Sequence, residues 1–270
     1  MTTLECSRLD VRIASTQVVS NFNLLLQPGQ FWGLLGANGS GKTTLLRCLA
    51  GLHRPRTGAL LLQARNMQTL PRRSIARQLG MLQQHTAYVF DCNVLQTAMT
   101  GRHPHLGRWQ RESSTDFRKA SEALSAVDLA GFASRSVAAL SGGEARRLAV
   151  ATLLVQEPDI MLLDEPTNHL DLRHQIRIMD MLRELTCKQG RSAIAALHDI
   201  NLAARFCTHI VMLFGDGQWG AGSSGEMLTE ASLERLYGCR VEKAVGSSGS
   251  WFYPTNPPRQ PVNHQEGASG

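Results

Sequence analysis

The sequence has 270 residues, of which 43% are hydrophobic and 19% are charged, and its formal net charge is +6. This length allows one large domain or two small ones, and the composition excludes a fibrous, collagen-like or wholly disordered chain. The positive charge favours an anionic partner, with nucleic acid, a nucleotide and an anionic membrane surface as candidates. No arginine-rich tract interleaved with aromatic residues occurs, which weakens the nucleic-acid alternative.

The lack of a targeting signal and the scattered cysteines lead us to expect a cytosolic protein. No apolar run approaches the roughly 18 residues that a membrane-spanning helix needs. Residues 1–12 lack the apolar stretch of a secretory signal. The six cysteines are scattered and form no C-x-x-C pair, so we expect buried or inert thiols rather than disulfides.

The N-terminal third predicts strands that surround one helix. Residues 1–35 alternate apolar and polar side chains, which predicts short strands, and Phe31–Leu35 has the compact apolar character of a buried strand. A helix is expected over residues 42–50. Residues 57–83 predict further strands, with a short helix around residues 72–79.

The middle of the chain changes character. Residues 85–139 contain a loop rich in glycine and proline, followed by a helical stretch around Phe117–Val127. We interpret them as a helical subdomain.

From residue 141 onward, helices and strands alternate. Strands are expected at Ile160–Leu163, Ala193–Leu197 and Ile210–Phe214, and apolar residues recur at helical spacing from Leu172 to Leu185. This alternation predicts an α/β fold, with a mostly parallel sheet and helices on both of its faces. Trp251–Tyr253 is interpreted as a last strand that packs on the core. The Pro-, Gly- and Ser-rich tail from residue 254 is expected to be disordered.

Residues Gly36–Thr43 fit the pattern G-x-x-x-x-G-K-[ST], between a predicted strand and a predicted helix. Glycines let backbone N–H groups turn toward phosphate oxygens, and the helix N-terminus adds its positive dipole end. Lys42 is expected to reach the β- and γ-phosphates, and Thr43 to bind Mg²⁺. The expected ATP-binding residues of this loop are Gly36, Ala37, Asn38, Gly39, Ser40, Gly41, Lys42, Thr43 and Thr44.

Two carboxylates follow the predicted strand at Ile160–Leu163. Asp164 is expected to bind Mg²⁺ directly or through water. Glu165 is the candidate base that orients the attacking water. A strand followed by a solvated acidic turn is the structural alternative, and the upstream phosphate-binding loop weakens it.

The pentapeptide Leu140–Glu144 precedes a helix, with Ser141 as a good N-cap. Together with the phosphate-binding loop, this pentapeptide makes the chain resemble the ATP-binding cassette family over about residues 4–243. The resemblance implies a P-loop nucleotide-hydrolase core, an N-terminal antiparallel β subdomain and an inserted helical subdomain at about residues 85–139. Residues 244–270 would then form a C-terminal strand and a disordered tail.

The resemblance also implies roles for single residues in a head-to-tail homodimer. Ser141, Gly142 and Gly143 would contact the γ-phosphate held by the partner's loop. Asp171 matches the D-loop, and Gln84 matches the Q-loop, which links Mg²⁺ and water to a membrane permease. His198 matches the switch histidine that contacts the γ-phosphate.

The sequence departs from the family's pattern at a few positions. Ile13 and Ala14 stand where an aromatic residue usually stacks on adenine, Gln83 replaces a frequent proline, and Ala145 replaces a frequent polar residue. Because of the first departure, the sequence does not identify the residue that contacts the adenine ring.

The function implied by the resemblance is an ATP-binding and ATP-hydrolysing subunit that energises a membrane importer. The implied cofactors are ATP and Mg²⁺. The implied partners are permease subunits, a second copy of the chain and a substrate-binding protein, with no nucleic acid. The expected location is the cytoplasmic face of the inner membrane, as a peripheral protein. A soluble cassette protein of translation or chromosome maintenance, a fused exporter and a switch GTPase explain the motifs less well.

Two short segments bear on the cargo. Residues Met99–Leu106 and Leu236–Val241 are similar to importer subunits for iron chelates, haem and cobalamin. We expect a metal chelate as cargo, with iron–siderophore or haem ahead of cobalamin, and another small nutrient as the alternative. Residues 85–106 are expected to face the permease. His103 and His105 lack a third ligand, so we expect no metal site there.

Overall fold

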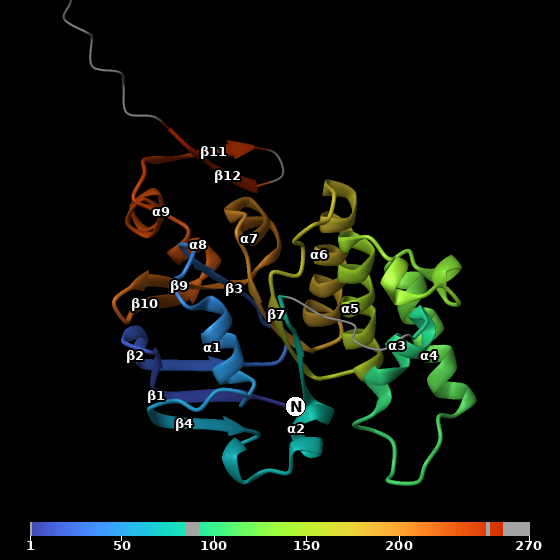
Figure 1. The fold of residues 1–270 in the computed structure, drawn as a ribbon. Coiled ribbons are helices and arrows are strands. Elements are labelled where there is room, and N and C mark those ends of the chain that lie inside the picture. The colour runs from blue at the N-terminus through green and yellow to red at the C-terminus, as the bar shows by residue number, and fades with distance from the viewer. Residues whose placement is uncertain (1, 85–91, 247–248, 256–270) are drawn as a thin grey trace, which may run out of the picture.

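The computed structural model describes residues 2–84, 92–246 and 249–255. Its centre is a six-stranded sheet in the order β10-β9-β3-β8-β7-β6 (Figure 1). The strands are β3 (Phe31–Gly36), β6 (Leu79–Leu82), β7 (Ile160–Asp164), β8 (Ser192–Ala196), β9 (His209–Gly215) and β10 (Gln218–Ser223). All neighbours run parallel except β9 and β10, which form a hairpin. The predicted mostly parallel sheet is confirmed.

An antiparallel sheet in the order β2-β1-β4-β5 forms the expected N-terminal subdomain. Its strands are β1 (Leu4–Ile13), β2 (Thr16–Leu26), β4 (Thr57–Leu62) and β5 (Arg65–Asn66). The expectation of short strands is wrong for β1 and β2, which have 10 and 11 residues. Register shifts interrupt the pairing of β1 with β2, and such bulges let long strands bend.

One face of the central sheet lies against the antiparallel sheet and α1 (Lys42–Leu49). Leu45, Leu46 and Leu49 of α1 are buried in a core shared with both sheets. Helices therefore cover this face less completely than the strand–helix alternation predicted, because the N-terminal strands supply much of its apolar cover.

The other face is covered by α5 (Gly142–Gln156), α6 (Leu172–Cys187) and α7 (Ile200–Phe206), which share a second core (Figure 1). Beyond them lie α3 (Val94–Met99) and α4 (Ser114–Ala126), whose buried side chains belong to the same core. The expected helical subdomain therefore packs on α5, which lies outside the expected bounds of 85–139. Residues 85–91, at its expected start, lie outside the described residues.

The remaining elements are short or C-terminal. In the part of the chain that the structure describes, they are α2 (Arg72–Gln78), α8 (Ser224–Met227), α9 (Glu230–Tyr237), β11 (Val241–Gly246), β12 (Gly249–Pro254) and the 3₁₀ helices at Met67–Thr69, Thr100–Arg102, Ala130–Phe132 and Val137–Ala139.

The C-terminal hairpin of β11 and β12 is separate from the two larger sheets. Phe252 is buried, but Trp251 and Tyr253 are 45% and 44% exposed, so the expected packing of this strand on the core is correct for Phe252 alone. Alternation along a strand explains this, because neighbouring side chains point to opposite faces. The expected division after residue 243 falls inside β11, and residues 256–270 lie outside the described residues, so that division stays a prediction.

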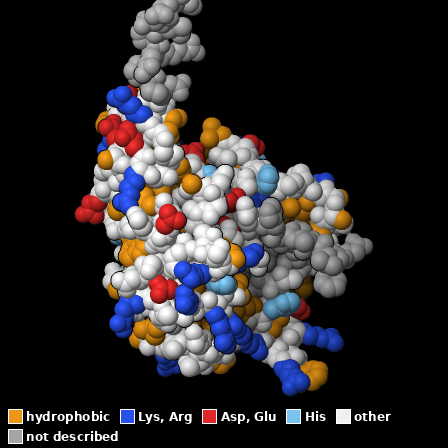
Figure 2. All heavy atoms as spheres, turned by 60° about the vertical axis from the view of Figure 1, so that its left-hand side comes forward, with side chains coloured by type: hydrophobic (Ala, Val, Ile, Leu, Met, Phe, Trp, Pro, Cys, Tyr) orange, Lys and Arg blue, Asp and Glu red, His pale blue; other side chains and the backbone are white. Residues whose placement is uncertain are grey.

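Positive charge gathers on part of the surface. In the face drawn in Figure 2, Lys and Arg side chains are most frequent in the lower half, with few Asp or Glu side chains between them.

Candidate functional site

Glycines shape the loop between β3 and α1. Gly39 and Gly41 have φ angles of 78° and 94°, in the left-handed region that favours glycine. A Cβ added to Gly41, the N-cap of α1, would clash with the methyl groups of Val18 in β2. The loop therefore requires glycine at position 41, where the pattern G-x-x-x-x-G-K-[ST] places one.

Lys42 turns back into this loop from the start of α1. Its ammonium donates hydrogen bonds to the carbonyl oxygens of Gly36 at 2.8 Å and Ala37 at 3.2 Å. Burial lowers the pKa of Lys42, and the charges of Glu165 and Asp164 partly offset this effect. A cation enclosed by a glycine loop at a helix N-terminus is an arrangement that suits phosphate groups.

Asp164 ends β7 and is 1% exposed. Neither of its carboxylate oxygens has a hydrogen-bond partner in the described part of the chain. Burial raises the pKa of this carboxyl group, although the nearby Thr43 hydroxyl acts in the opposite direction. Buried carboxylate oxygens without donors are unfavourable unless a cation binds them. Oxygen atoms of Asp164, Thr43 and Gln84 fit the hard Mg²⁺ ion.

Glu165 follows Asp164 and is held at both carboxylate oxygens. His198 Nε2 lies 2.6 Å from Oε1, and Asn168 Nδ2 donates to Oε2 at 2.9 Å. Burial alone would raise the pKa of Glu165, but the hydrogen bond and charge of His198, helped by Lys42, hold that pKa below its usual value. The residue has a φ of 53°, a strained conformation of the kind that clusters at functional sites.

Most of these groups line one cleft of about 640 Å³, whereas Asp164 is not among its lining residues. The lining residues are Ile13, Asn38, Gly39, Ser40, Gly41, Lys42, Thr43, Thr44, Gln84, Glu165, Asn168 and His198. They come together because the carboxyl ends of the parallel strands β3, β7 and β8 meet at one edge of the sheet, where ligands bind in open α/β folds. The cleft joins a phosphate-binding loop, a candidate base and metal-binding oxygens.

The pentapeptide at the start of α5 lies outside this cleft. Ser141 is the N-cap, and its Oγ accepts from Glu144 N at 3.3 Å while Glu144 Oε2 accepts from Ser141 N at 2.7 Å. These bonds lower the pKa of Glu144, the hydrogen bond from the Ser141 backbone most of all. Apart from its chain neighbours and the backbone of its own helix, no described atom lies within 4 Å of a Cβ built on Gly142, so the tip of the helix is open on that side.

Gly143 and Asp171 also lie away from the cleft. A Cβ on Gly143 would approach the carbonyl oxygen of His169 at 3.0 Å, which places the pentapeptide beside the segment that precedes α6. Asp171 is the N-cap of α6 and accepts from His174 N at 2.9 Å. The predicted site residues of these two segments therefore form a second group, separate from the cleft of the same chain.

Asn168 and Arg146 are functional candidates that the sequence did not single out. Asn168 lies three residues before Asp171, and its side-chain amide donates to the carboxylate of Glu165 at 2.9 Å. The spacing of Asn168 from Glu165 is a signal that could have revealed this contact. A turn, in which Asn168 N donates to Glu165 O at 3.1 Å, brings residues three positions apart together. Arg146 donates to main-chain carbonyls at the cleft, including that of Glu165 at 2.7 Å. No sequence pattern marks such a contact.

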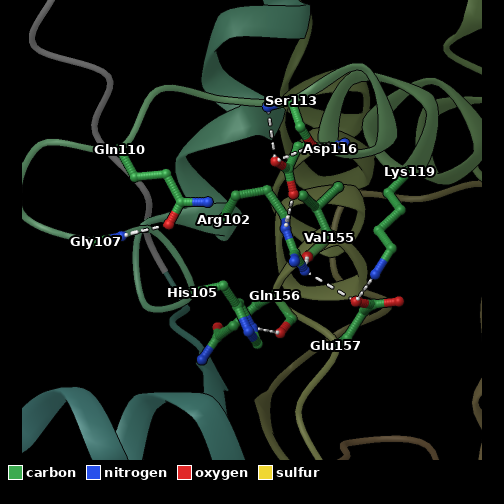
Figure 3. Close-up of polar contacts among 10 residues, drawn as sticks. All are labelled: Arg102, His105, Gly107, Gln110, Ser113, Asp116, Lys119, Val155, Gln156 and Glu157. Atoms are coloured by element: carbon green, nitrogen blue, oxygen red, sulfur yellow. Dashed lines mark hydrogen bonds and ion pairs between the residues drawn. The ribbon is translucent and has the colours of Figure 1, made fainter.

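Arg102, in the segment that resembles metal-chelate importers, is buried inside the helical region (Figure 3). Its guanidinium binds Asp116 Oδ1 at 2.8 Å, Glu157 Oε2 at 2.9 Å and the carbonyl oxygen of Val155 at 3.1 Å. Lys119 completes the network at Glu157 Oε2, at 2.5 Å. The expectation that the whole segment 85–106 faces a permease is therefore wrong for Arg102, which holds α4 against the end of α5.

The loop after Arg102 makes further internal contacts. Arg73 and Arg77 of α2 both donate to the carbonyl oxygen of Pro104, at 2.9 and 2.8 Å. The ring of His105 contacts the carbonyl oxygen of Gln156 at 2.8 Å (Figure 3).

Within residues 2–84, 92–246 and 249–255, no group of three His, Cys, Asp or Glu side chains is placed to hold a metal ion.

None of the helices in the described ranges combines the length and the apolar character needed to cross a bilayer.

Comparison of the sequence with known proteins identifies the family of the chain. A family model described as "ABC transporter" matches residues 19–168. A cobalamin import ATP-binding protein of Halobacterium salinarum is 35% identical over 91% of this chain, which spans only 61% of that longer protein. An ATP-binding protein of Bacillus subtilis, described as part of a siderophore transport system, is 37% identical over 89% of this chain and 88% of its own length. A hemin import ATP-binding protein of Rhizobium meliloti is 36% identical over 90% and 94%.

Solved structures agree in fold. An inward-facing transporter described as metal-chelate type has a TM-score of 0.81 at 25% identity, covering 95% of this chain and 98% of the other. A dimeric ATP-binding cassette in a post-hydrolysis state with ADP and Pi has a TM-score of 0.72 at 25% identity, covering 82% and 98%.

Proposed function

Since the chain belongs to the ABC transporter family, we propose that it is the ATP-binding and ATP-hydrolysing subunit of a membrane importer. One observation carries the proposal. A single cleft holds the glycine loop with Lys42, the candidate base Glu165 with His198, and Gln84. This is the set of groups that phosphoryl transfer to water requires.

In this proposal ATP binds with its phosphates in the loop from Gly36 to Thr44. Backbone N–H groups at the start of α1 donate to phosphate oxygens, and Lys42 supplies positive charge at the β- and γ-phosphates. Thr43, Gln84 and Asp164 would hold Mg²⁺, as the donor-free buried oxygens of Asp164 support. The bound cation would neutralise charge on the β- and γ-phosphates.

Glu165 then acts on the attacking water. Its carboxylate orients the water and accepts a proton as the water oxygen bonds to the γ-phosphorus and the bond to the bridging oxygen of ADP breaks. The lowered pKa of Glu165 keeps the carboxylate ionised and ready to accept that proton. Contacts to His198 and Asn168 hold its two oxygens in place.

The second group of predicted residues suits a neighbouring copy. Ser141, Gly142, Gly143 and Asp171 lie outside the chain's own cleft, and the tip of α5 is open at Gly142. We infer that two copies close head to tail, so that this tip meets the γ-phosphate bound by the other copy. The dimeric state of a cassette of similar fold supports this arrangement.

The descriptions of the relatives support the membrane partners and the cargo that we propose. Relatives described as importers of cobalamin, siderophores and hemin match most of this chain. We infer permease subunits as partners, a substrate-binding protein in the full system, and a peripheral position at the cytoplasmic face of the inner membrane. The inferred cargo is a metal chelate, with iron–siderophore or haem ahead of cobalamin.

Two experiments test the proposal. ATP hydrolysis by the purified chain, alone and with the permease, tests the enzymatic part, and its absence in both preparations would refute that part. Uptake of labelled ferric siderophore, haem and cobalamin after gene deletion tests the cargo. Wild-type uptake of all three, in a strain without a redundant importer, would refute the proposed cargo and would not affect the proposed ATPase activity.

A further inference from the structure

Arg146, one turn after the start of α5, is a buried residue whose guanidinium contacts the main chain beside the nucleotide cleft. It is 6% exposed. Its Nη1 donates to the carbonyl oxygens of Gln83 at 2.5 Å and Gln84 at 3.4 Å. Its Nη2 donates to the carbonyl oxygens of Asp164 and Glu165, the latter at 2.7 Å. One guanidinium thus contacts the main chain of three residues expected to bind Mg²⁺ or water, and of one neighbour.

These carbonyl groups lie where β6 and β7 stop pairing with each other, although β7 still pairs with β8 at Asp164. The parallel ladder between β6 and β7 ends at the pair Leu82 and Leu163. Beyond this pair the two strands have no ladder bonds to each other, and buried carbonyl groups require donors from elsewhere. A planar guanidinium has donors in a fixed fork and can bridge two diverging strands. Arg146 therefore replaces the missing ladder with a side-chain cross-link.

We propose that Arg146 is a positioning residue for ATP hydrolysis, which fixes the ends of β6 and β7 and links them to α5. Its effect on Glu165 is direct, because that residue has the strained φ of 53° and needs support from its surroundings. Its link to α5 matters because Ser141 caps the same helix. A displacement of this helix by a second copy is transmitted through Arg146 to the main chain that carries the base.

The first test uses hydrogen–deuterium exchange in the full chain without nucleotide. We expect Arg146→Gln to accelerate amide exchange in residues 79–84 and 160–168 by about tenfold, because both strand ends lose their cross-link. Arg102→Gln is the matched control, since Arg102 is also a buried arginine, 7% exposed, but its contacts lie in the helical region (Figure 3). It should accelerate exchange in residues 94–126 instead.

Two results of this test would overturn the proposal. One is unchanged exchange in both strand ends of Arg146→Gln. The other is equal acceleration there in Arg102→Gln, since the effect would then be general destabilisation. If Arg146→Gln does not fold, Arg146→Lys replaces it, because one ammonium cannot bridge both strands and should still accelerate exchange at one strand end.

The kinetic test rests on the proposed function. We expect Arg146→Gln to bind ATP in EDTA as tightly as the native chain, while kcat falls about 100-fold because the base is displaced. Arg102→Gln, compared at a temperature where both variants are folded, should keep kcat within about twofold. A native kcat in Arg146→Gln would refute the positioning role. Absence of ATP binding by the native chain would instead refute the proposed function, and the exchange result would stand.

Discussion

His198 Nε2 and Glu165 Oε1 lie 2.6 Å apart, across the ends of two neighbouring parallel strands. Glu165 follows β7 directly, and His198 lies two residues after β8. The contact therefore depends on the alignment of β7 with β8, in which Asp164 pairs with Ala196. Both residues line the nucleotide cleft, so the hydrogen bond between them determines the orientation and the charge with which the candidate base Glu165 contacts water.

Removing the imidazole should shift the pH dependence of hydrolysis. A lowered pKa keeps the Glu165 carboxylate ionised as the pH falls below 4.5, the ordinary value for this group. In His198→Ala the pKa should rise toward or above that value, so the acid limb of the kcat/KM–pH profile should move to higher pH. The exposed His103→Ala serves as the control and should leave the profile in place. An unmoved acid limb in His198→Ala would contradict this account of the pair.

Lys42→Ala should weaken nucleotide binding itself. The substitution removes a charged donor beside the phosphates, so ATP affinity measured by calorimetry should fall about 10- to 100-fold. Lys188→Ala removes an exposed lysine at the end of α6, whose ion pair with Glu184 is solvated, and should bind ATP normally. Equal affinities of the two variants would reject the assignment of the glycine loop.

The base of the nucleotide should be held weakly. No aromatic side chain lines the cleft in the described residues, and Ile13 occupies the expected position at 45% exposure. We predict little discrimination between ATP and GTP, and a gain of ~1–3 kcal/mol in ATP binding on Ile13→Tyr. Ala14 is a poor place for the new ring, because its φ of 49° disfavours a bulky side chain.

The control for this prediction is Leu25→Tyr, at a position in β2 with 46% exposure and outside the cleft. It should leave ATP affinity unchanged. A strong native preference for ATP over GTP would show that another group recognises the base.

Ser141→Arg should separate binding from hydrolysis. The new side chain would block the tip of α5, which is open at Gly142 and lies outside the chain's own cleft. We expect native ATP affinity in the single chain, with loss of ATP-dependent dimers by light scattering and of hydrolysis. Ser121→Arg, on the exposed side of α4, should behave like the native chain. Native turnover in Ser141→Arg would exclude a role of this helix tip in trans.

The sequence was sufficient for the fold class and for most strands of the central sheet, but the helices α8 and α9 were not predicted. Periodicity and glycine placement mark β3, α1 and β7 because local residues determine them. Parallel topology then brings their ends to one edge, so residues far apart in sequence, such as Lys42 and Glu165, were expected near each other. The roles assigned to these residues remain predictions that the experiments above address.

Contacts between a side chain and a distant main chain were beyond the reach of sequence patterns. Arg146 and Arg102 are both arginines next to glycine-containing motifs, yet each is buried and bound to carbonyl or carboxylate oxygens. Their burial depends on how α5 packs on the sheet and on α4. Exposure of Trp251 was missed because side chains alternate along β12, so that Phe252 is buried while its neighbours are exposed.

The most direct test of the proposed ATPase is Glu165→Gln, compared with Glu184→Gln at an exposed site on α6. The amide keeps the shape of the side chain but cannot accept a proton, so ATP binding should persist while single-turnover hydrolysis falls about 100-fold or more. ATP-bound dimers should then accumulate, whereas Glu184→Gln should hydrolyse ATP as the native chain does. Near-native hydrolysis by Glu165→Gln would contradict the assignment of this residue as the base and, with it, the mechanism proposed here.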